Sequence, residues 1–242
     1  MFSRQVSIGV NHEEILGTFA LPKTGTPGIL FLHGWAGSQE RDMERAQDIA
    51  ALGCICFTFD MRGHAGTRSQ LPSVTRGDNL GDVLAAYDVL ASHPSVDPDS
   101  IAVVGSSYGG YLASILTSQR PVRWLALRAP ALYRDQNWDV PKAALDREDL
   151  ARYRSSIIPA EENRALRNCR SFKGDVLIVS SENDEIIPFT VIASYRAAFL
   201  YARSLTSRVI EGADHALNTR ECQQAYDFLL LRWLREMVLG AR

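Results

Sequence analysis

Residues 101–110 contain a serine that could act as a nucleophile, and the glycines around it are spaced so that its hydroxyl can be exposed. The apolar run 101–104 leads into the pattern Gly-x-Ser-x-Gly at 105–109. A serine hydroxyl becomes a useful nucleophile when a sharp turn from strand to helix exposes it to a base and to backbone amides. Gly105 and Gly109 allow such a turn because they lack a Cβ atom. We therefore predict that Ser107 is the nucleophile; the alternative is a tight glycine turn with a spectator serine.

A serine nucleophile needs a base that takes its proton, and the chain has five histidines. His215 follows the last apolar run, 208–210, and precedes a helical pattern over 216–238. This position is at the sheet edge where Ser107 is expected, so the imidazole can reach the hydroxyl. We predict that His215 is the general base; the alternative is a surface histidine at the start of a helix.

A carboxylate must fix the tautomer of the imidazole and stabilise its cation. Asp184 comes after the apolar run 176–179 and before Pro188, where a turn from strand to helix is expected. The order Ser107, Asp184, His215 is the order of nucleophile, acid and base in one architecture of serine hydrolases. Asp184 is therefore the preferred acid. Three nearby carboxylates remain as alternatives: Glu182, Glu185 and Asp214.

Backbone amides that face the developing oxyanion usually supply the largest electrostatic contribution to such a reaction. The elbow places the amide of Tyr108 directly after the nucleophile. A second donor is expected from the glycine-bearing turn after the apolar run 28–32, where the Trp35 amide is the candidate. His33 is expected to brace this turn rather than to bind a metal, because no second ligand stands at helical spacing from it.

The elements that must position these residues alternate along the chain. Apolar runs expected to be strands lie at 6–10, 15–21, 28–32, 54–59, 101–104, 124–127, 176–179 and 208–210, with a hairpin turn at 11–14. Helical spacing of apolar residues occurs at 40–52, 79–92, 108–118, 189–201 and 216–238. This alternation predicts an α/β fold, a mostly parallel sheet with helices on both faces. Ligands bind such sheets beyond the carboxyl ends of the strands.

The segment 133–174 separates two apolar runs by more than an ordinary connection. Its helical stretches, near 142–154 and 160–168, predict a small lid over the carboxyl edge of the sheet, and a lid usually shapes substrate choice. Four of its residues are candidates for the lining of the substrate pocket: Tyr133, Trp138, Ile157 and Ile158.

The bulk composition favours one domain and a small-molecule partner. A chain of 242 residues that is 46% hydrophobic can bury one large core, so we expect a single domain over 1–242 with the lid-like insertion at about 133–174. The net charge is −2 and no run of like charges occurs. Nucleic acid and an anionic membrane are therefore not expected partners.

No stretch is long and apolar enough for a signal peptide core or a membrane span, which predicts a cytoplasmic protein. The four cysteines, at 54, 56, 169 and 222, have neither disulfide-motif nor metal-ligand spacing and are expected to be packing residues. The oligomeric state stays open, with a homodimer as one alternative.

The chain resembles the α/β-hydrolase superfamily in the elbow, in His-Gly-Trp at 33–35 and in Asp-Met-Arg-Gly-His-Ala-Gly at 60–66. Its size, its short insertion and Arg-Gly-Asp-Asn-Leu-Gly-Asp at 76–82 are similar to small bacterial carboxylesterases, dienelactone-hydrolase-like proteins and catalytic domains of prolyl-oligopeptidase-like enzymes. The resemblance implies an eight-stranded sheet and hydrolysis through an acyl-enzyme. Gly-Trp-Ala at 34–36 in place of a His-Gly-Gly-Gly loop argues against lipase-like and bulky tertiary esters.

We therefore expect a serine hydrolase that cleaves a carboxylic ester, a carboxylesterase-like enzyme that needs no metal and no organic cofactor. Cleavage of a thioester or of a short peptide of the acylaminoacyl or prolyl type is the alternative within the same chemistry. An alternative of another class is a hydrolase-fold binding protein that has lost turnover.

Overall fold

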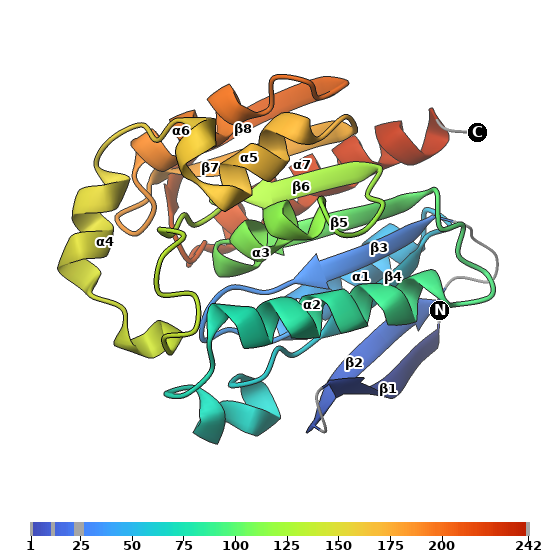
Figure 1. The fold of residues 1–242 in the computed structure, drawn as a ribbon. Coiled ribbons are helices and arrows are strands. Elements are labelled where there is room, and N and C mark those ends of the chain that lie inside the picture. The colour runs from blue at the N-terminus through green and yellow to red at the C-terminus, as the bar shows by residue number, and fades with distance from the viewer. Residues whose placement is uncertain (1, 11–12, 22–26, 241–242) are drawn as a thin grey trace.

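The fold is built on one eight-stranded sheet, seen in a computed structural model that describes residues 2–10, 13–21 and 27–240 (Figure 1). The strand order is β1-β2-β4-β3-β5-β6-β7-β8. Strands β1 and β2 pair antiparallel, β2 joins β4 antiparallel, and the remaining neighbours are parallel. The strands are β1 (Phe2–Val10), β2 (Glu13–Leu21), β3 (Gly28–Leu32), β4 (Ile55–Phe59), β5 (Ile101–Ser106), β6 (Trp124–Arg128), β7 (Asp175–Asn183) and β8 (Ser204–Asp214). The predicted mostly parallel α/β sheet is confirmed.

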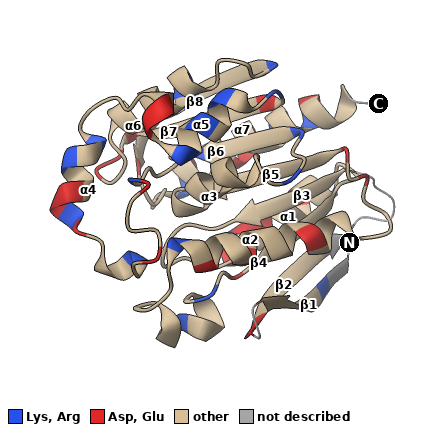
Figure 2. Cartoon of the chain, in the orientation of Figure 1, with Lys and Arg blue, Asp and Glu red and all other residues tan. Residues whose placement is uncertain are grey.

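Helices cover both faces of the sheet. On one face lie α1 (Glu40–Ala50) and α7 (Arg220–Leu239). On the other lie α2 (Arg76–Ala91), α3 (Tyr108–Leu116), α5 (Arg164–Ser171) and α6 (Phe189–Ala198). Charged residues of both signs occur on several helices, and α4 (Arg147–Arg154) carries both in its short length (Figure 2). None of the helices in the described ranges is long and apolar enough to cross a membrane.

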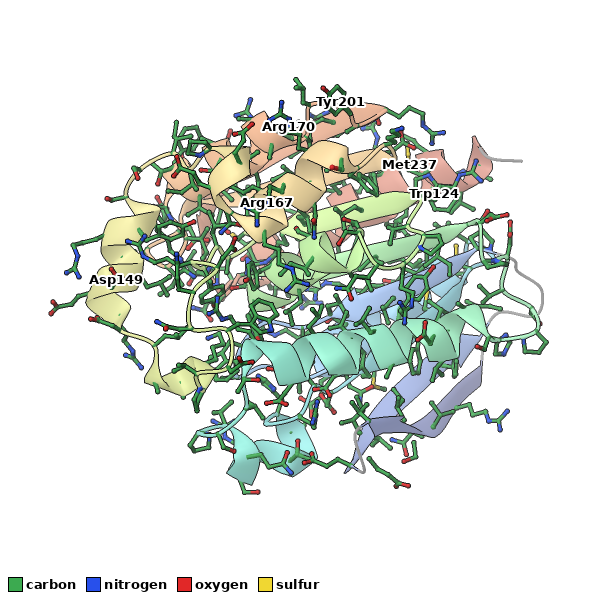
Figure 3. The ribbon with its side chains drawn as sticks, in the orientation of Figure 1. Trp124, Asp149, Arg167, Arg170, Tyr201 and Met237 are labelled. Carbon is green, nitrogen blue, oxygen red and sulfur yellow. The ribbon has the colours of Figure 1, made fainter. Side chains whose placement is uncertain are left out.

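The two core layers follow from the alternation of side chains along each buried strand. In β3, Ile29 and Phe31 enter the layer under α1 and α7, while Leu30 and Leu32 enter the layer under α2 and α3. Trp124 of β6, which is 1% exposed, belongs to the first of these layers (Figure 3). Strands buried on both faces read as unbroken apolar runs, which is why the sequence identifies them.

Several boundaries differ from the expected ones for local reasons. Helix α2 begins at Arg76 rather than near 79, because Thr75 and Asp78 form a reciprocal capping box at its start. Strand β8 is longer than the apolar run 208–210, since its outer residues pair with β7 at the exposed edge of the sheet. Of the predicted hairpin turn, 11–12 lie outside the described residues, whereas Glu13 and Glu14 belong to β2.

The long connection between β6 and β7 has two parts. Residues 133–159 carry a short 3-10 turn at Lys142–Ala144 and then α4, which lies beyond the edge where the parallel strands end (left in Figure 1). The later part carries α5, which packs on α3 and α6 as an ordinary crossover helix does. Of the predicted lid, only residues 133–159 therefore lie beyond the edge of the sheet where a lid would cover the site.

The elbow between β5 and α3 depends on close approach of backbones. A Cβ atom built on Gly109 would lie 2.1 Å from the carbonyl oxygen of Leu32 and 2.6 Å from that of His33. A Cβ atom on Gly105 would lie 2.7 Å from the backbone of Gly110. These neighbours are main-chain atoms and cannot move aside as a side chain can, so both glycines are required by packing.

We expect Gly109→Ala to lower the free energy of unfolding by about 3 kcal/mol or more, because the added methyl group must push the ends of β3 and α3 apart. Chemical denaturation monitored by circular dichroism measures the change. Gly66→Ala is the matched control, since a Cβ atom at Gly66 meets nothing within 4 Å. Equal stability of the two variants would show that the elbow is not tightly packed.

Candidate active site

Ser107 sits at the turn from β5 to α3 in a conformation that non-glycine residues rarely adopt, with φ 50° and ψ −110°. A non-glycine residue held in such a sparsely populated conformation costs on the order of 1–3 kcal/mol. Three backbone hydrogen bonds hold it: the Ser107 amide donates to Arg128 at 2.8 Å, and the Ser107 carbonyl accepts from Ala131 at 2.9 Å and from Tyr111 at 3.1 Å. The predicted elbow therefore exists and presents the hydroxyl at the edge of the sheet.

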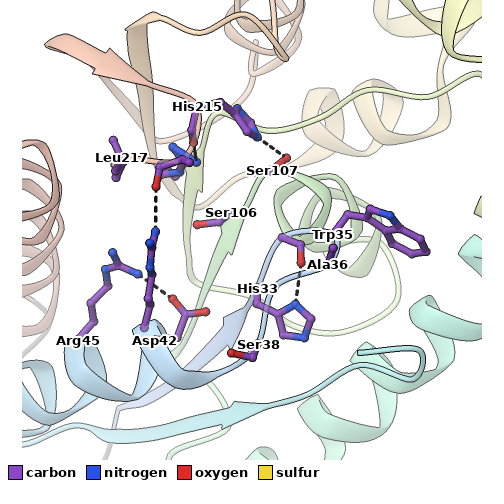
Figure 4. A pocket seen from close by; sticks show the side chains of 15 residues that line it. His33, Trp35, Ala36, Ser38, Asp42, Arg45, Ser106, Ser107, His215 and Leu217 are labelled. Atoms are coloured by element: carbon purple, nitrogen blue, oxygen red, sulfur yellow. Dashed lines mark hydrogen bonds and ion pairs between the residues drawn. The ribbon is translucent and has the colours of Figure 1, made fainter. Parts of the chain in front are cut away.

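A chain of hydrogen bonds joins the three residues predicted as nucleophile, base and acid. Ser107 Oγ lies 3.0 Å from His215 Nε2, and His215 Nδ1 lies 2.7 Å from Asp184 Oδ2 (Figure 4 shows the first pair). A carboxylate only accepts hydrogen bonds, so Nδ1 carries the proton of the neutral ring and Nε2 is left to accept from the serine hydroxyl. This is the tautomer that a general base requires.

Asp184 is the best-anchored carboxylate in this region. Its Oδ1 accepts hydrogen bonds from the amides of Ile186 and Ile187 at 3.0 and 2.8 Å, and its side chain is 5% exposed. Burial by itself would raise the pKa of Asp184, but the hydrogen bonds from His215, Ile187 and Ile186 outweigh it and hold the pKa below its usual value. The carboxylate therefore stays charged beside the imidazole.

None of the three alternative acids forms a hydrogen bond with the imidazole of His215 in the described structure. Glu182 accepts a hydrogen bond from the Gly212 amide at 2.7 Å. Asp214 binds the amide and the side chain of Asn218. Glu185 is exposed. The structure thus brings Asp184, and not these three, to His215.

Two arginines that the sequence analysis did not single out hold the loop of His215. The guanidinium of Arg128 donates to the His215 carbonyl, and that of Arg41 donates to the Ala216 carbonyl at 2.8 Å. Arg128 ends β6 and pairs in register with Ser106, next to the nucleophile. The sequence did contain a signal for Arg128, because it is a charged residue at the carboxyl end of a buried strand, the place where functional residues of such sheets gather.

The loop after β3 packs directly against the nucleophile. A Cβ atom on Gly34 would lie 3.5 Å from Ser107 Cβ. His33 braces the loop as expected, because Nδ1 donates to the Gly34 carbonyl at 2.8 Å and Nε2 accepts from the Met61 amide at 3.1 Å. Burial, together with the neighbouring ring of His64, lowers the pKa of His33 to about 4, so the ring is neutral and keeps both bonds.

The two predicted oxyanion donors belong to residues whose side chains pack on each other. The rings of Trp35 and Tyr108 meet edge to face with centroids 5.4 Å apart. The Trp35 ring extends away from the Ser107–His215 pair (Figure 4). The Tyr108 hydroxyl donates to Asn79 Oδ1 at 3.1 Å, and Asn79 in turn contacts the buried carboxylate of Asp82 at 3.2 Å.

The two motifs at 60–66 and 76–82 meet beneath the elbow. Arg62 of the first motif forms an ion pair with Asp82 of the second at 2.6 Å, and its backbone amide donates to the same carboxylate. Asp82 is fully buried, so this pair satisfies a charge that would otherwise be costly. The motifs therefore support the elbow through Tyr108 rather than entering the site.

A cavity of about 290 Å³ opens beside Ser107 and His215. The charged side chains on its wall are Arg41, Asp42, Arg45 and Arg128. Among the described residues, no group of three or more His, Cys, Asp or Glu side chains is placed to hold a metal ion.

The four residues predicted to line the substrate pocket do not line this cavity. Tyr133 is buried behind Tyr108, with ring centroids 5.9 Å apart, and Trp138 packs on Tyr111. Ile158 is buried and its amide donates to Ser194 Oγ of α6, whereas Ile157 is 59% exposed. The insertion turns these side chains into the core or toward solvent at this cavity, and a role for them in substrate binding stays a prediction.

Comparisons with known proteins agree with this geometry. The family model described as "Alpha/beta hydrolase family" matches residues 29–226. Acylamino-acid-releasing enzyme 2 of rice is 29% identical over 109 residues, which cover 43% of this chain and 14% of that enzyme. The chain thus corresponds to a minor part of that relative's length.

Two solved structures share the fold at low sequence identity. A dienelactone hydrolase from Anabaena variabilis is 19% identical with a TM-score of 0.68, and the match covers 96% of each chain. An acylaminoacyl peptidase from Pyrococcus horikoshii is 17% identical with a TM-score of 0.74, covering 96% of this chain and 41% of that one. Together with the family match over most of the chain, the elbow and the sheet order show that this protein belongs to the alpha/beta hydrolase family.

Proposed function

We propose that the protein is a serine hydrolase that cleaves a carboxylic ester of a small molecule. The observation that carries this proposal is the hydrogen-bond chain from Ser107 through His215 to Asp184, with distances of 3.0 and 2.7 Å. Nucleophile, base and orienting acid within hydrogen-bond reach of each other are the signature of an activated serine.

The reaction follows from the tautomer of His215. As Ser107 Oγ attacks the substrate carbonyl carbon, its proton moves to Nε2, and Asp184 stabilises the resulting imidazolium. The imidazolium then protonates the leaving alcohol while the carbon–oxygen bond breaks and the acyl-enzyme forms. Water repeats the sequence on the acyl-enzyme, which releases the acid and returns the proton.

The amides of Trp35 and Tyr108 are proposed as the donors that hold the tetrahedral oxyanion. The loop of Trp35 packs against Ser107, and Tyr108 follows Ser107 at the start of α3. The brace by His33 supports this role, since donors fixed before the reaction need no reorganisation when charge develops.

Ester cleavage is preferred, and peptide cleavage is the second candidate. The structural similarity to a dienelactone hydrolase supports the first, because a lactone is a cyclic ester. The relative from rice and the neighbour from Pyrococcus horikoshii carry names of enzymes that act on acylated amino acids or peptides, which supports the second. Thioester cleavage uses the same machinery.

We expect a fluorophosphonate probe to label the protein at Ser107, because only an activated serine hydroxyl attacks such a reagent readily. Ser107→Ala should remove labelling and lower ester turnover by at least about 10³-fold while the fold is retained. Mass spectrometry of the labelled peptide and circular dichroism of the variant measure these effects. A folded wild-type protein that stays unlabelled would favour a binding protein that has lost turnover.

Asp184→Asn should lower kcat by about 10³- to 10⁴-fold, because an amide in this place no longer enforces the Nδ1–H tautomer. Steady-state kinetics on a chromogenic ester gives the ratio. Glu182→Gln is the matched control, since Glu182 binds the Gly212 amide and not the imidazole. If the control lost activity and Asp184→Asn kept it, the acid would be misassigned.

A further inference from the structure

Lys142 lies against the side chains of both residues whose amides are proposed as oxyanion donors. Its Nζ is 3.8 Å from the centroid of the Trp35 ring and 5.0 Å from that of Tyr108. An ammonium group at this distance over an aromatic face is held by the ring quadrupole. The insertion therefore places a cation against the side chains of the two residues proposed to form the oxyanion hole.

The backbone of Lys142 is fixed rather than free. Its amide donates to the Val74 carbonyl at 2.9 Å, and Pro141 forms a β-bridge with Thr75. The segment is thus tied to the start of α2. The position of the ammonium follows from this attachment and from the aromatic rings.

Three cations surround the ring of Tyr133. Arg154, Lys142 and Arg76 lie 4.9, 5.3 and 5.7 Å from its centroid. Arg154 donates to backbone carbonyls, as does Arg76, which binds those of residues 134, 136 and 137. Neutral carbonyls satisfy these guanidinium groups without cancelling their charge.

Two carboxylates of this part of the chain are paired with other cations. Asp135 binds Arg167, and Asp149 binds Arg134 (Asp149 lies on α4 in Figure 3). Among the described residues, no carboxylate comes within ion-pair distance of Lys142 Nζ. The neighbourhood of Lys142 therefore has an uncompensated positive charge, which favours an anionic ligand.

Burial and the neighbouring arginines also affect the pKa of Lys142. Burial lowers the pKa of Lys142 to about 7, and Arg154, Arg76 and Arg147 shift it in the same direction. Burial also lowers the pKa of His64, whose ring meets the edge of Trp35. Lys142 is therefore a cation below about pH 7 and loses its charge above it.

We propose that Lys142 binds a carboxylate carried by the acyl part of the substrate, so that the enzyme prefers esters with an anionic acyl chain. This inference rests on the proposed function, because the substrate carbonyl is placed between the amides of Trp35 and Tyr108. Under this proposal, the acyl chain leaves that carbonyl toward the rings of Trp35 and Tyr108, against which the ammonium lies.

The test compares kcat/KM for para-nitrophenyl adipate, which has a free terminal carboxylate, with that for para-nitrophenyl hexanoate. The wild-type enzyme should favour adipate at pH 6, and Lys142→Met should lower this preference about 10- to 100-fold, the range for hydrogen bonds to charged groups. Lys142→Arg should retain the preference. Lys173→Met is the matched control, since Lys173 is exposed, and it should leave the ratio unchanged.

The pH dependence supplies a second measure. The preference for adipate should fall between about pH 6 and pH 8 in the wild type as Lys142 loses its proton, and should not fall in Lys142→Arg. Any effect of pH on the chemical step that both esters share cancels in the ratio.

If Lys142→Met lowered kcat/KM equally for both esters, the proposal would be overturned, and Lys142 would only support the Trp35 loop. A preference for the hexanoate ester of para-hydroxybenzoate, whose charge is on the leaving group, would overturn the placement on the acyl side. If no ester is cleaved, the proposed function fails. Isothermal titration calorimetry then compares the binding of adipamate with that of hexanamide and tests the inference separately. Tighter binding of adipamate that depends on Lys142 supports it, and equal binding overturns it.

Discussion

The close approach of α3 to the ends of β3 and β5 is the constraint on which the rest of the site depends. Ser107 occupies its left-handed conformation because Gly105 and Gly109 let backbones meet at distances that a Cβ atom would forbid. The strain in Ser107 is balanced by hydrogen bonds to Arg128 and Ala131 from the adjacent strand and its continuation. A hydroxyl fixed in this way can give its proton to a correctly placed imidazole and so become reactive.

The parallel sheet provides that placement through its register. Ser106 pairs with Arg128, and β7 and β8 end at the same edge, so the turns that follow them bring Asp184 and His215 toward Ser107. Arg128 then closes the arrangement, because its carbonyl accepts from Ser107 and its guanidinium donates to the loop of His215. One residue thus couples the positions of the nucleophile and the base.

The sequence was sufficient for the sheet, the elbow and the meeting of Ser107, Asp184 and His215, because buried parallel strands have a distinct apolar pattern and their ends share an edge. It was insufficient for the insertion. The path of that segment is set by long-range contacts such as those of Arg76 with three backbone carbonyls. The hydrophobic periodicity of the sequence does not indicate such contacts. The sequence therefore could not indicate that Trp138 and Ile157 lie away from the cavity beside Ser107.

The brace of the oxyanion loop and the attachment of the insertion come from separate parts of the chain. His33 and Met61 hold the loop from within the strand framework, whereas Val74 and Thr75 hold the segment of Lys142 from the entrance to α2. Under the proposed role of Lys142, substitutions in the insertion change which substrates bind and leave the hydrogen bonds that brace the oxyanion loop unchanged. In evolutionary terms, this division makes the scaffold modular, since selectivity can drift while reactivity is inherited intact.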